Sequence, residues 1–337
     1  MKHLFLTCVL SMLSAVVGGA TFSNPLRTRN GSDPYLVYVE GYYYLMTTTW
    51  RDLQITRAKT LEGLKTGESK TIYTMSNPKP EGNDVWAPEL HKINGTWYVY
   101  FSQDRKCWVL TGGSEPWGSY GDNKQVHQEW GIDGTVVEIP GWGHHYVFSC
   151  EVGELQSLCI AKLLTPTTVG PIHTLSQPTK PWERVEIPVN EGPAGLHHGN
   201  KTWIAYSASF CKTPDYQIAT LLWDGKGDPL QATSWTKSSK PLFSSANGNY
   251  GTAHNGHVLS PSLLCTLLTH CVSSFFTSPD GTEIWNIYHA TQNSSGSCGA
   301  DRQTFAQKVN WNSDGSPDFG IPVKSGEVLR APSGEQE

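Results

Sequence analysis

The sequence predicts an all-β fold, a five-bladed β-propeller, and three observations support this prediction. A turn followed by an aromatic, β-branched strand recurs five times along the 337 residues. A further apolar segment follows each copy, and no amphipathic helical pattern competes with these segments. The 33 glycines and 21 prolines suit a chain with many turns. An all-β sandwich is the alternative fold, because it also contains consecutive hairpins.

The five hairpin strands follow one another at intervals of about 50 residues, which is the length of a propeller blade. They begin at Gly41 (GYYYLMTTT), Gly95 (GTWYVYFS), Gly143 (GHHYVFSC), Asn200 (NKTWIAYSAS) and Gly281 (GTEIWNIYHA). The third segments of the repeats begin at Leu53, Cys107, Leu158, Tyr216 and Thr304. Three recurrent strands and a less regular fourth strand make the four-stranded sheet of a blade.

The interval between the fourth and fifth hairpins is longer than the others. The excess lies in residues 257–274, which are rich in Leu, Ser and Cys and contain no Asp, Glu, Lys or Arg. We interpret this stretch as an insertion into the fifth repeat. It is either a retained intron of the gene model or a surface loop that Cys265 and Cys271 close.

The first twenty residues have the pattern of a secretory signal peptide. Lys2 and His3 precede an apolar stretch over residues 4–17, and small residues follow up to Ala20. Cleavage after Ala20 leaves residues 21–337 as a single domain that is secreted and extracellular. Secretion permits disulfides, but an odd number of cysteines remains, so we expect at least one to be unpaired. These cysteines are Cys107, Cys150, Cys159, Cys211, Cys265, Cys271 and Cys298.

The charge pattern gives no sign of a nucleic acid or membrane partner. The formal net charge is −5, and the sequence contains no run of Lys or Arg. No segment after the signal peptide is long and apolar enough to span a bilayer. We find no oligomerisation signal and expect a monomer.

Acidic or polar residues stand just ahead of the hairpins in all five repeats. In a propeller these places converge on the central channel, so we expect a cluster of side chains there. Its members are Asp33, Glu89, Asp133, Glu191 and His254. Each one alone is also typical of a turn, but clustered carboxyl groups raise one another's pKa and indicate a functional site. Two carboxyl groups facing one pocket suit the cleavage of a glycosidic bond.

Taken together, the motifs resemble glycoside hydrolase family 43 from about Asn24 to about Val323. The segments that carry the resemblance are NPLRTRNGSDPYL, VWAPELHKINGTWYVYFS, IDGTVVE, VNEGPAGLHH, YSAS, TPDY, GTAHNG and FFTSPDGTEIWNIYHAT. The resemblance implies a five-bladed propeller and an inverting mechanism that uses three acidic residues. By this resemblance Asp33 is the general base, Glu191 is the general acid, and Asp133 raises the pKa of that acid and orients it.

The resemblance also implies the residues that bind the sugar. Trp86 offers a ring face, Arg302 hydrogen-bonds sugar hydroxyls, and Glu89 braces the site. His254 resembles a central histidine that lies near a water-coordinated metal ion. A Ca²⁺ ion in the channel would therefore be structural, and the chemistry itself requires no cofactor.

Within the family the motifs resemble α-L-arabinofuranosidases, which release terminal arabinose from the plant cell-wall polysaccharides arabinan and arabinoxylan. A β-xylosidase or an endo-arabinanase of the same family is the nearest alternative. A non-catalytic carbohydrate-binding propeller would keep Trp86 but lose one acid. A fructan-cleaving propeller would carry an Asn-Asp-Pro-Asn-Gly type motif where this chain has GSDPYL. A protein-interaction propeller would have no reason to place acids at one position of several blades.

Overall fold

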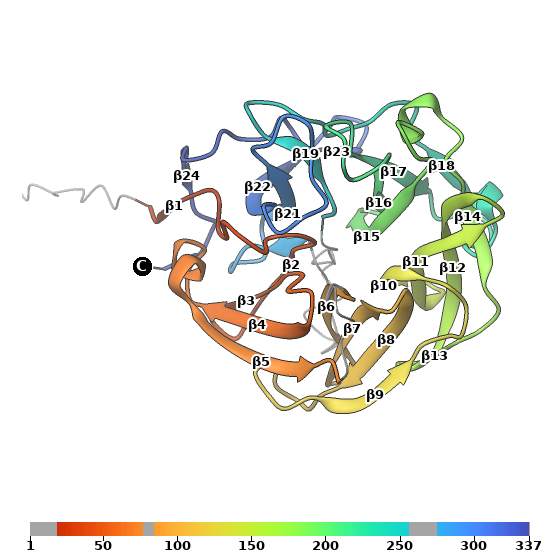
Figure 1. The fold of residues 1–337 in the computed structure, drawn as a ribbon, viewed down its shortest axis with the longest axis horizontal. Coiled ribbons are helices and arrows are strands. Elements are labelled where there is room, and N and C mark those ends of the chain that lie inside the picture. The colour runs from red at the N-terminus through yellow and green to blue at the C-terminus, as the bar shows by residue number, and fades with distance from the viewer. Residues whose placement is uncertain (1–18, 77–83, 256–274, 337) are drawn as a thin grey trace, which may run out of the picture.

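The computed structural model describes residues 19–76, 84–255 and 275–336. Within these ranges five antiparallel sheets of four or five strands form a ring around a central axis (Figure 1). The first strand of each sheet lies nearest the axis, and the following strands succeed it outward (Figure 1). The predicted five-bladed β-propeller is confirmed. No helix in these ranges is long and apolar enough to cross a membrane.

Blades 1 to 3 succeed one another from residue 35 to residue 176. Blade 1 contains β2 (Tyr35–Val39), β3 (Tyr42–Met46), β4 (Asp52–Ala58) and β5 (Glu68–Thr74). Blade 2 contains β6 (Val85–Ile93), β7 (Thr96–Gln103), β8 (Lys106–Thr111) and β9 (Gly121–Gln125). Blade 3 contains β10 (Ile132–Ile139), β11 (Gly143–Val152), β12 (Leu155–Thr165), β13 (Thr168–Val169) and β14 (His173–Ser176).

Blades 4 and 5 and a small terminal sheet complete the ring. Blade 4 contains β15 (Asn190–His198), β16 (Lys201–Ala208), β17 (Gln217–Trp223) and β18 (Trp235–Lys237). Blade 5 contains β19 (Tyr250–Ala253), β20 (Phe276–Thr277), β21 (Ile284–Thr291), β22 (Gln303–Trp311) and β23 (Pro317–Asp318). The terminal sheet pairs β1 (Thr21–Ser23) with β24 (Val328–Arg330). Short 3₁₀ turns are η1 (Glu62–Thr66), η2 (Pro181–Glu183) and η3 (Ala232–Ser234).

Two-residue turns join the inner strand to the second strand in blades 1, 2 and 4. Glu40 and Gly41 connect β2 to β3 with φ values of 52° and 83°. Asn94 and Gly95 connect β6 to β7 with φ values of 50° and 84°. Two consecutive positive φ angles are those of a type I′ turn, whose twist matches the twist of paired strands. All five predicted hairpins and third strands are present.

Five apolar clusters hold the described blades together, and each cluster is shared by two neighbouring blades. Tyr44 of blade 1 and Val99 of blade 2, for example, belong to one cluster. The clusters join blades 1 and 2, 2 and 3, 3 and 4, 4 and 5, and 5 and 1. Burial of apolar surface between blades therefore stabilises the ring.

The inner strand of blade 5 is divided into two parts that pair with the same partner. Ala253 of β19 lies opposite His289 of β21, and Phe276 of β20 lies opposite Trp285 of the same strand. In blades 2, 3 and 4 one continuous strand spans this distance. Without residues 257–274, four residues would separate Ala253 from Phe276, whereas three separate their partners His289 and Trp285. The inner strand would then have one extra residue. A one-residue bulge of this kind is present in the inner strands of blades 2, 3 and 4.

Several predicted features lie outside the described residues. These are residues 1–18 of the signal peptide, the 257–274 segment and its cysteines Cys265 and Cys271. Among the described cysteines, Cys150 pairs with Cys159 and Cys211 pairs with Cys298, while Cys107 is a buried free thiol.

Candidate active site

In each blade one residue in or beside the inner strand, near the axis, has a positive φ angle. These residues and their φ values are Asp33 (52°), Ala87 (45°), Asp133 (55°), Gly192 (54°) and His254 (46°). In blades 2, 3 and 4 this residue falls where the strand register shifts by one. A bulge of this kind redirects the side chains beside it, and bulges are frequent next to active sites. Left-handed backbone at four non-glycine residues also concentrates conformational strain at this end of the propeller.

Side chains from the preceding blade support these positions. The backbone N–H of Ala87 donates to Thr48 Oγ1 at 2.8 Å. The N–H groups of Asp133 and His254 donate to Ser102 Oγ and Ser207 Oγ, each at 2.8 Å. Each blade thus positions the first residues of the next blade.

The structure corrects the predicted equivalence of the five polar residues. Ala87, not Glu89, has the positive-φ place in blade 2, and Gly192, not Glu191, has it in blade 4. Glu191 comes one residue earlier, at the place that Trp86 has in blade 2. The hairpin pattern locates the strands, but it does not show at which residue a bulge falls.

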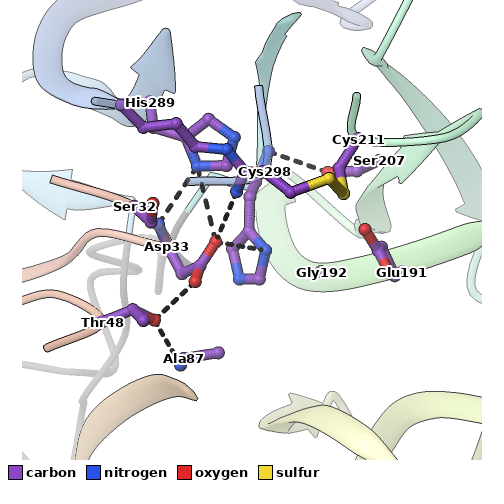
Figure 2. A network of polar contacts seen from close by, with 12 residues as sticks. Ser32, Asp33, Thr48, Ala87, Glu191, Gly192, Ser207, Cys211, His289 and Cys298 are labelled. Atoms are coloured by element: carbon purple, nitrogen blue, oxygen red, sulfur yellow. Dashed lines mark hydrogen bonds and ion pairs between the residues drawn. A yellow bond between two sulfur atoms is a disulfide. The ribbon is translucent and has the colours of Figure 1, made fainter. Parts of the chain in front are cut away.

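Asp33 lies at the centre of a network of polar contacts (Figure 2). Thr48 Oγ1 donates to its Oδ2 at 2.5 Å, and Arg302 Nη1 donates to its Oδ1 at 3.3 Å. His254 Nδ1 lies 3.3 Å from the same Oδ1. Because Arg302 can only donate, Asp33 is held as an acceptor with both oxygens oriented.

His289 supports Asp33 as a neutral imidazole. Its Nδ1 accepts the backbone N–H of Asp33 at 3.1 Å, so this nitrogen carries no proton. Burial lowers the pKa of His289 well below its usual range, and the charges of Arg302 and His254 lower it further. The 3.5 Å approach of Nδ1 to Asp33 Oδ1 is therefore not an ion pair.

Glu191 has a different environment, made mainly of neutral donors. Tyr216 Oη donates to its Oε1 at 2.9 Å, and Gln156 Nε2 donates to its Oε2 at 2.6 Å. Burial raises the pKa of Glu191, and this effect exceeds the opposing effects of Tyr216, His254 and Arg302. The residue as a whole is half-buried. A carboxyl group with a raised pKa keeps its proton to higher pH, as a proton donor requires.

Asp133 is buried and has both a backbone donor and an imidazole beside it. Gly192 N–H donates to its Oδ2 at 3.2 Å, and His254 Nδ1 lies 3.8 Å from the same oxygen. Burial raises the pKa of Asp133 to about 7; His254 opposes the rise, whereas the charges of Glu191 and Asp33 add to it. The three acids therefore interact within one electrostatic cluster.

His254 balances the negative charge of this cluster. Burial lowers its pKa, but the carboxyl groups of Asp33, Asp133 and Glu191 outweigh burial and raise it overall. Gly192 permits the close packing here, because a Cβ on this residue would lie 2.9 Å from His254 Nδ1. The position therefore requires glycine for its positive φ and for its lack of a side chain.

The described residues offer little support for a directly ligated metal ion. They contain no group of three or more His, Cys, Asp or Glu side chains placed to hold one. Ca²⁺ prefers six to eight oxygen ligands, whereas the Nδ1 nitrogen of His254 lies beside Asp33 and Asp133, and Arg302 also contacts Asp33. A calcium ion bound through water near His254 stays a prediction.

The structure brings most of the predicted site residues together. Figure 2 shows Asp33 within the network of contacts and Glu191 apart from it, beyond Gly192. Arg302 connects them, because its guanidinium contacts Asp33 and its charge lowers the pKa of Glu191. Trp86 is half-buried. Glu89 does not join this network through any contact of the described residues, and its Oε2 lies 2.7 Å from His91 Nε2.

Sequence reasoning assigned no role to several side chains that position the acids. Tyr216 belongs to the TPDY motif and His289 to YHAT, so both stood in recognised segments without a stated function. Thr48 and Gln156 gave no signal. Their roles appear only in the tertiary structure, where Thr48 contacts Asp33 and Ala87, and Gln156 contacts Glu191.

Fold and site together indicate a class: a propeller with carboxyl groups clustered near its axis, which is typical of enzymes that hydrolyse glycosidic bonds. The chain belongs to family 43 of the glycosyl hydrolases, since the model of "Glycosyl hydrolases family 43" matches residues 22–317.

Individual relatives are similar over most of the chain. An "Extracellular exo-alpha-(1->5)-L-arabinofuranosidase" of Streptomyces avermitilis is 36% identical over 329 residues, which cover 91% of this chain and 64% of the relative. The chain therefore spans less than two thirds of that relative. A protein of the same name from Streptomyces chartreusis is 29% identical, covering 85% of this chain and 88% of the relative. The crystal structure of an alpha-L-arabinofuranosidase from Lactobacillus brevis superposes with a TM-score of 0.76 at 27% identity, covering 91% of this chain and 98% of the other.

Proposed function

We propose that this protein is a secreted glycoside hydrolase that releases terminal α-L-arabinofuranosyl residues from arabinan or arabinoxylan with inversion of configuration. The observation that carries this proposal is the cluster of Asp33, Asp133 and Glu191 around His254. The substrate class is supported by the names of the relatives, which include arabinofuranosidases.

In the proposed reaction Glu191 is the general acid. It holds its proton because burial raises its pKa, and it donates the proton to the glycosidic oxygen as the bond breaks. Asp33 accepts a proton from the water that attacks the anomeric carbon from the other side. Arg302 Nη1 and Thr48 Oγ1 keep the Asp33 carboxylate oriented for this step.

Asp133 acts on Glu191 and not on the substrate. Its Oδ2 accepts the backbone N–H of Gly192, the residue after Glu191, so Asp133 helps to orient the general acid. Trp86 and Arg302 would bind the arabinosyl ring through a ring face and through hydrogen bonds. No step requires a metal ion as a reactant.

Secretion is part of the proposal. The two disulfides of the described residues suit an oxidising compartment. Both Streptomyces relatives are named extracellular.

Product analysis by NMR on arabinan, arabinoxylan and xylan tests the proposal. We expect free arabinose that appears first as the β-anomer. Asp33→Asn and Glu191→Gln should each lose about 10²–10⁴-fold in kcat, as expected for removal of an acid or base. Glu327→Gln, which changes an exposed carboxyl group away from the cluster, is the matched control.

Other outcomes would contradict distinct parts of the proposal. Early α-anomer would exclude inversion. Xylose from xylan would indicate a β-xylosidase, and oligosaccharides from arabinan would indicate endo cleavage. Binding without hydrolysis would indicate a carbohydrate-binding propeller.

A further inference from the structure

A hollow that the proposed mechanism does not use lies beside the acid cluster. It has a volume of about 590 Å³, which is within the range of small-molecule sites. Trp50, Lys212 and the loop of residues 295–300 line it. We call it the Trp50 pocket.

The wall of the Trp50 pocket is tied directly to the acid cluster. Arg302 Nε donates to the carbonyl oxygen of Ser297 at 2.6 Å, and Nη1 of the same guanidinium binds Asp33. Ser32, the residue before Asp33, donates through Oγ to the carbonyl oxygen of Gly299 at 3.3 Å. The loop that lines the pocket therefore lies directly against Arg302 and Ser32, next to the acid cluster.

The loop that forms the wall is held rigidly. The Cys211–Cys298 disulfide links it to the segment that follows β16 (Figure 2). Gly296 has a φ of 81°, and a Cβ on it would lie 2.4 Å from the backbone carbon of Thr213. Only glycine allows these two segments to pack so closely. The pocket is thus preformed, which lowers the entropic cost of binding.

Trp50 is held in an unusual backbone conformation at the rim. Its φ is 76°, and its carbonyl oxygen accepts the N–H groups of Asp84 and Val85 at 3.1 and 3.0 Å. Its indole Nε1 donates to Asn30 Oδ1 at 3.3 Å, and the residue stays half-exposed. The surrounding contacts thus stabilise a left-handed conformation that a tryptophan rarely adopts.

The chemistry of the lining suits a neutral sugar. An indole face can cover the C–H groups of a sugar ring and remove apolar surface from water. Lys212 is exposed and, with the serine hydroxyls and backbone groups of the loop, offers donors for sugar hydroxyls. No Asp or Glu side chain lines the pocket among the described residues.

We propose that the Trp50 pocket binds a sugar unit of the polysaccharide beyond the terminal arabinosyl group, and that Trp50 is the platform on which this unit stacks. This inference rests on the proposed function, because it names a second subsite for the same substrate. Trp50 is a specificity residue here and has no part in bond cleavage.

Kinetics on substrates of two lengths test the subsite. Methyl α-L-arabinofuranoside has no second sugar, whereas arabinotriose has two further units. In Trp50→Ala we expect KM for arabinotriose to rise at least about tenfold, as for loss of an aromatic anchor. The kcat/KM for the methyl glycoside should stay within about threefold of the parent value, and Trp50→Phe should restore part of the loss.

Trp142→Ala is the matched control. Trp142 is 41% exposed and lies in the turn after β10, at the end of that strand remote from Asp133. Equal effects of Trp50→Ala on both substrates, or no effect on either, would overturn the subsite.

A binding measurement separates failure of the subsite from failure of the proposed function. Calorimetry compares Glu191→Gln with the double variant Trp50→Ala/Glu191→Gln, using arabinotriose as the ligand. Weaker binding by the double variant supports the subsite even if neither substrate is hydrolysed by the parent protein. Equal binding overturns the subsite while leaving any observed hydrolysis intact.

Discussion

At the scale of residues, three carboxyl groups of one cluster have unequal surroundings. Asp33 accepts from the cationic Arg302, whereas Glu191 accepts from the neutral donors Tyr216 and Gln156. Asp133 has a backbone N–H and the imidazole of His254. When neighbouring carboxyl groups have different environments, their pKa values differ. That difference indicates which group acts as the acid and which as the base.

Asp133→Asn should change how stability depends on pH. Burial raises the pKa of Asp133 from 3.8 to about 7, so the folded protein holds this proton at a pH where the unfolded chain has released it. The free energy of unfolding should therefore fall as the pH rises through this window, and Asp133→Asn should flatten that slope. Urea titrations at several pH values measure the slope, with Glu327→Gln as the control.

The same variant should change the pH dependence of catalysis. Burial and the charge of Glu191 both raise the pKa of Asp133, to about 7, so the two groups titrate together. Replacing Asp133 with a neutral amide should therefore remove a titration near pH 7 from the alkaline limb of kcat/KM. An unmoved limb would mean that Asp133 only supports the backbone of Gly192.

At the scale of elements, the inner strands decide which side chains reach the axis. A one-residue bulge recurs in the inner strands of blades 2, 3 and 4, and positive φ marks the corresponding residues of blades 1 and 5. In blade 5 the strand resumes at Phe276, after residues that the other blades lack. The inner strand therefore accommodates an insertion directly after His254 without losing its partner β21.

Deleting residues 257–274, which joins Gly256 to Phe275, should give a folded protein with the arrangement of the other blades. Removing a long loop lowers the entropic cost of folding, so the free energy of unfolding should rise by about 2 kcal/mol. Thermal unfolding and soluble yield measure this. Replacing the segment with a Gly/Ser stretch of equal length is the control, and an insoluble deletion variant would show that the segment is an integral part of the blade.

At the scale of the whole molecule, the ring must close between its last and first blades. Leu36 and Leu45 of blade 1 share an apolar cluster with Trp285 of blade 5, and Phe22 from β1 belongs to the same cluster. The N-terminal segment also binds blade 5, where Leu26 N–H donates to the carbonyl oxygen of Thr304 at 2.8 Å. Closure therefore joins chain segments that are far apart in sequence.

Phe22→Ala should weaken this closure without touching the acid cluster. Phe22 is 2% exposed, and its ring centroid lies 5.8 Å from that of Trp285. Truncation of a buried phenylalanine costs about 3–5 kcal/mol, so the Tm should fall by several degrees while kcat at low temperature stays unchanged. Ile321→Ala, at a residue that is 66% exposed, is the control. A Tm within a degree of the parent would show that closure depends on other contacts.

The sequence by itself determined that the chain has five repeats. It also determined that the acidic residues lie at the same end of several blades. The turn at Asn94-Gly95 and the alternating strand that begins at Thr96 are specified by residues adjacent in the chain. Such local features can therefore be predicted from a single sequence. For the same reason the sequence alone predicts Asp33, Asp133 and Glu191 near the axis.

Only the tertiary structure decided which side chains meet. Asp33 contacts Arg302 from the opposite end of the chain, and Gln156 of blade 3 holds Glu191 of blade 4. The bulges that give Ala87 and Gly192 their places, and the Cys211–Cys298 pairing, likewise depend on packing between blades. Contacts of this range leave no periodic signal in a sequence, because they depend on the closure of the ring and not on the spacing of residues.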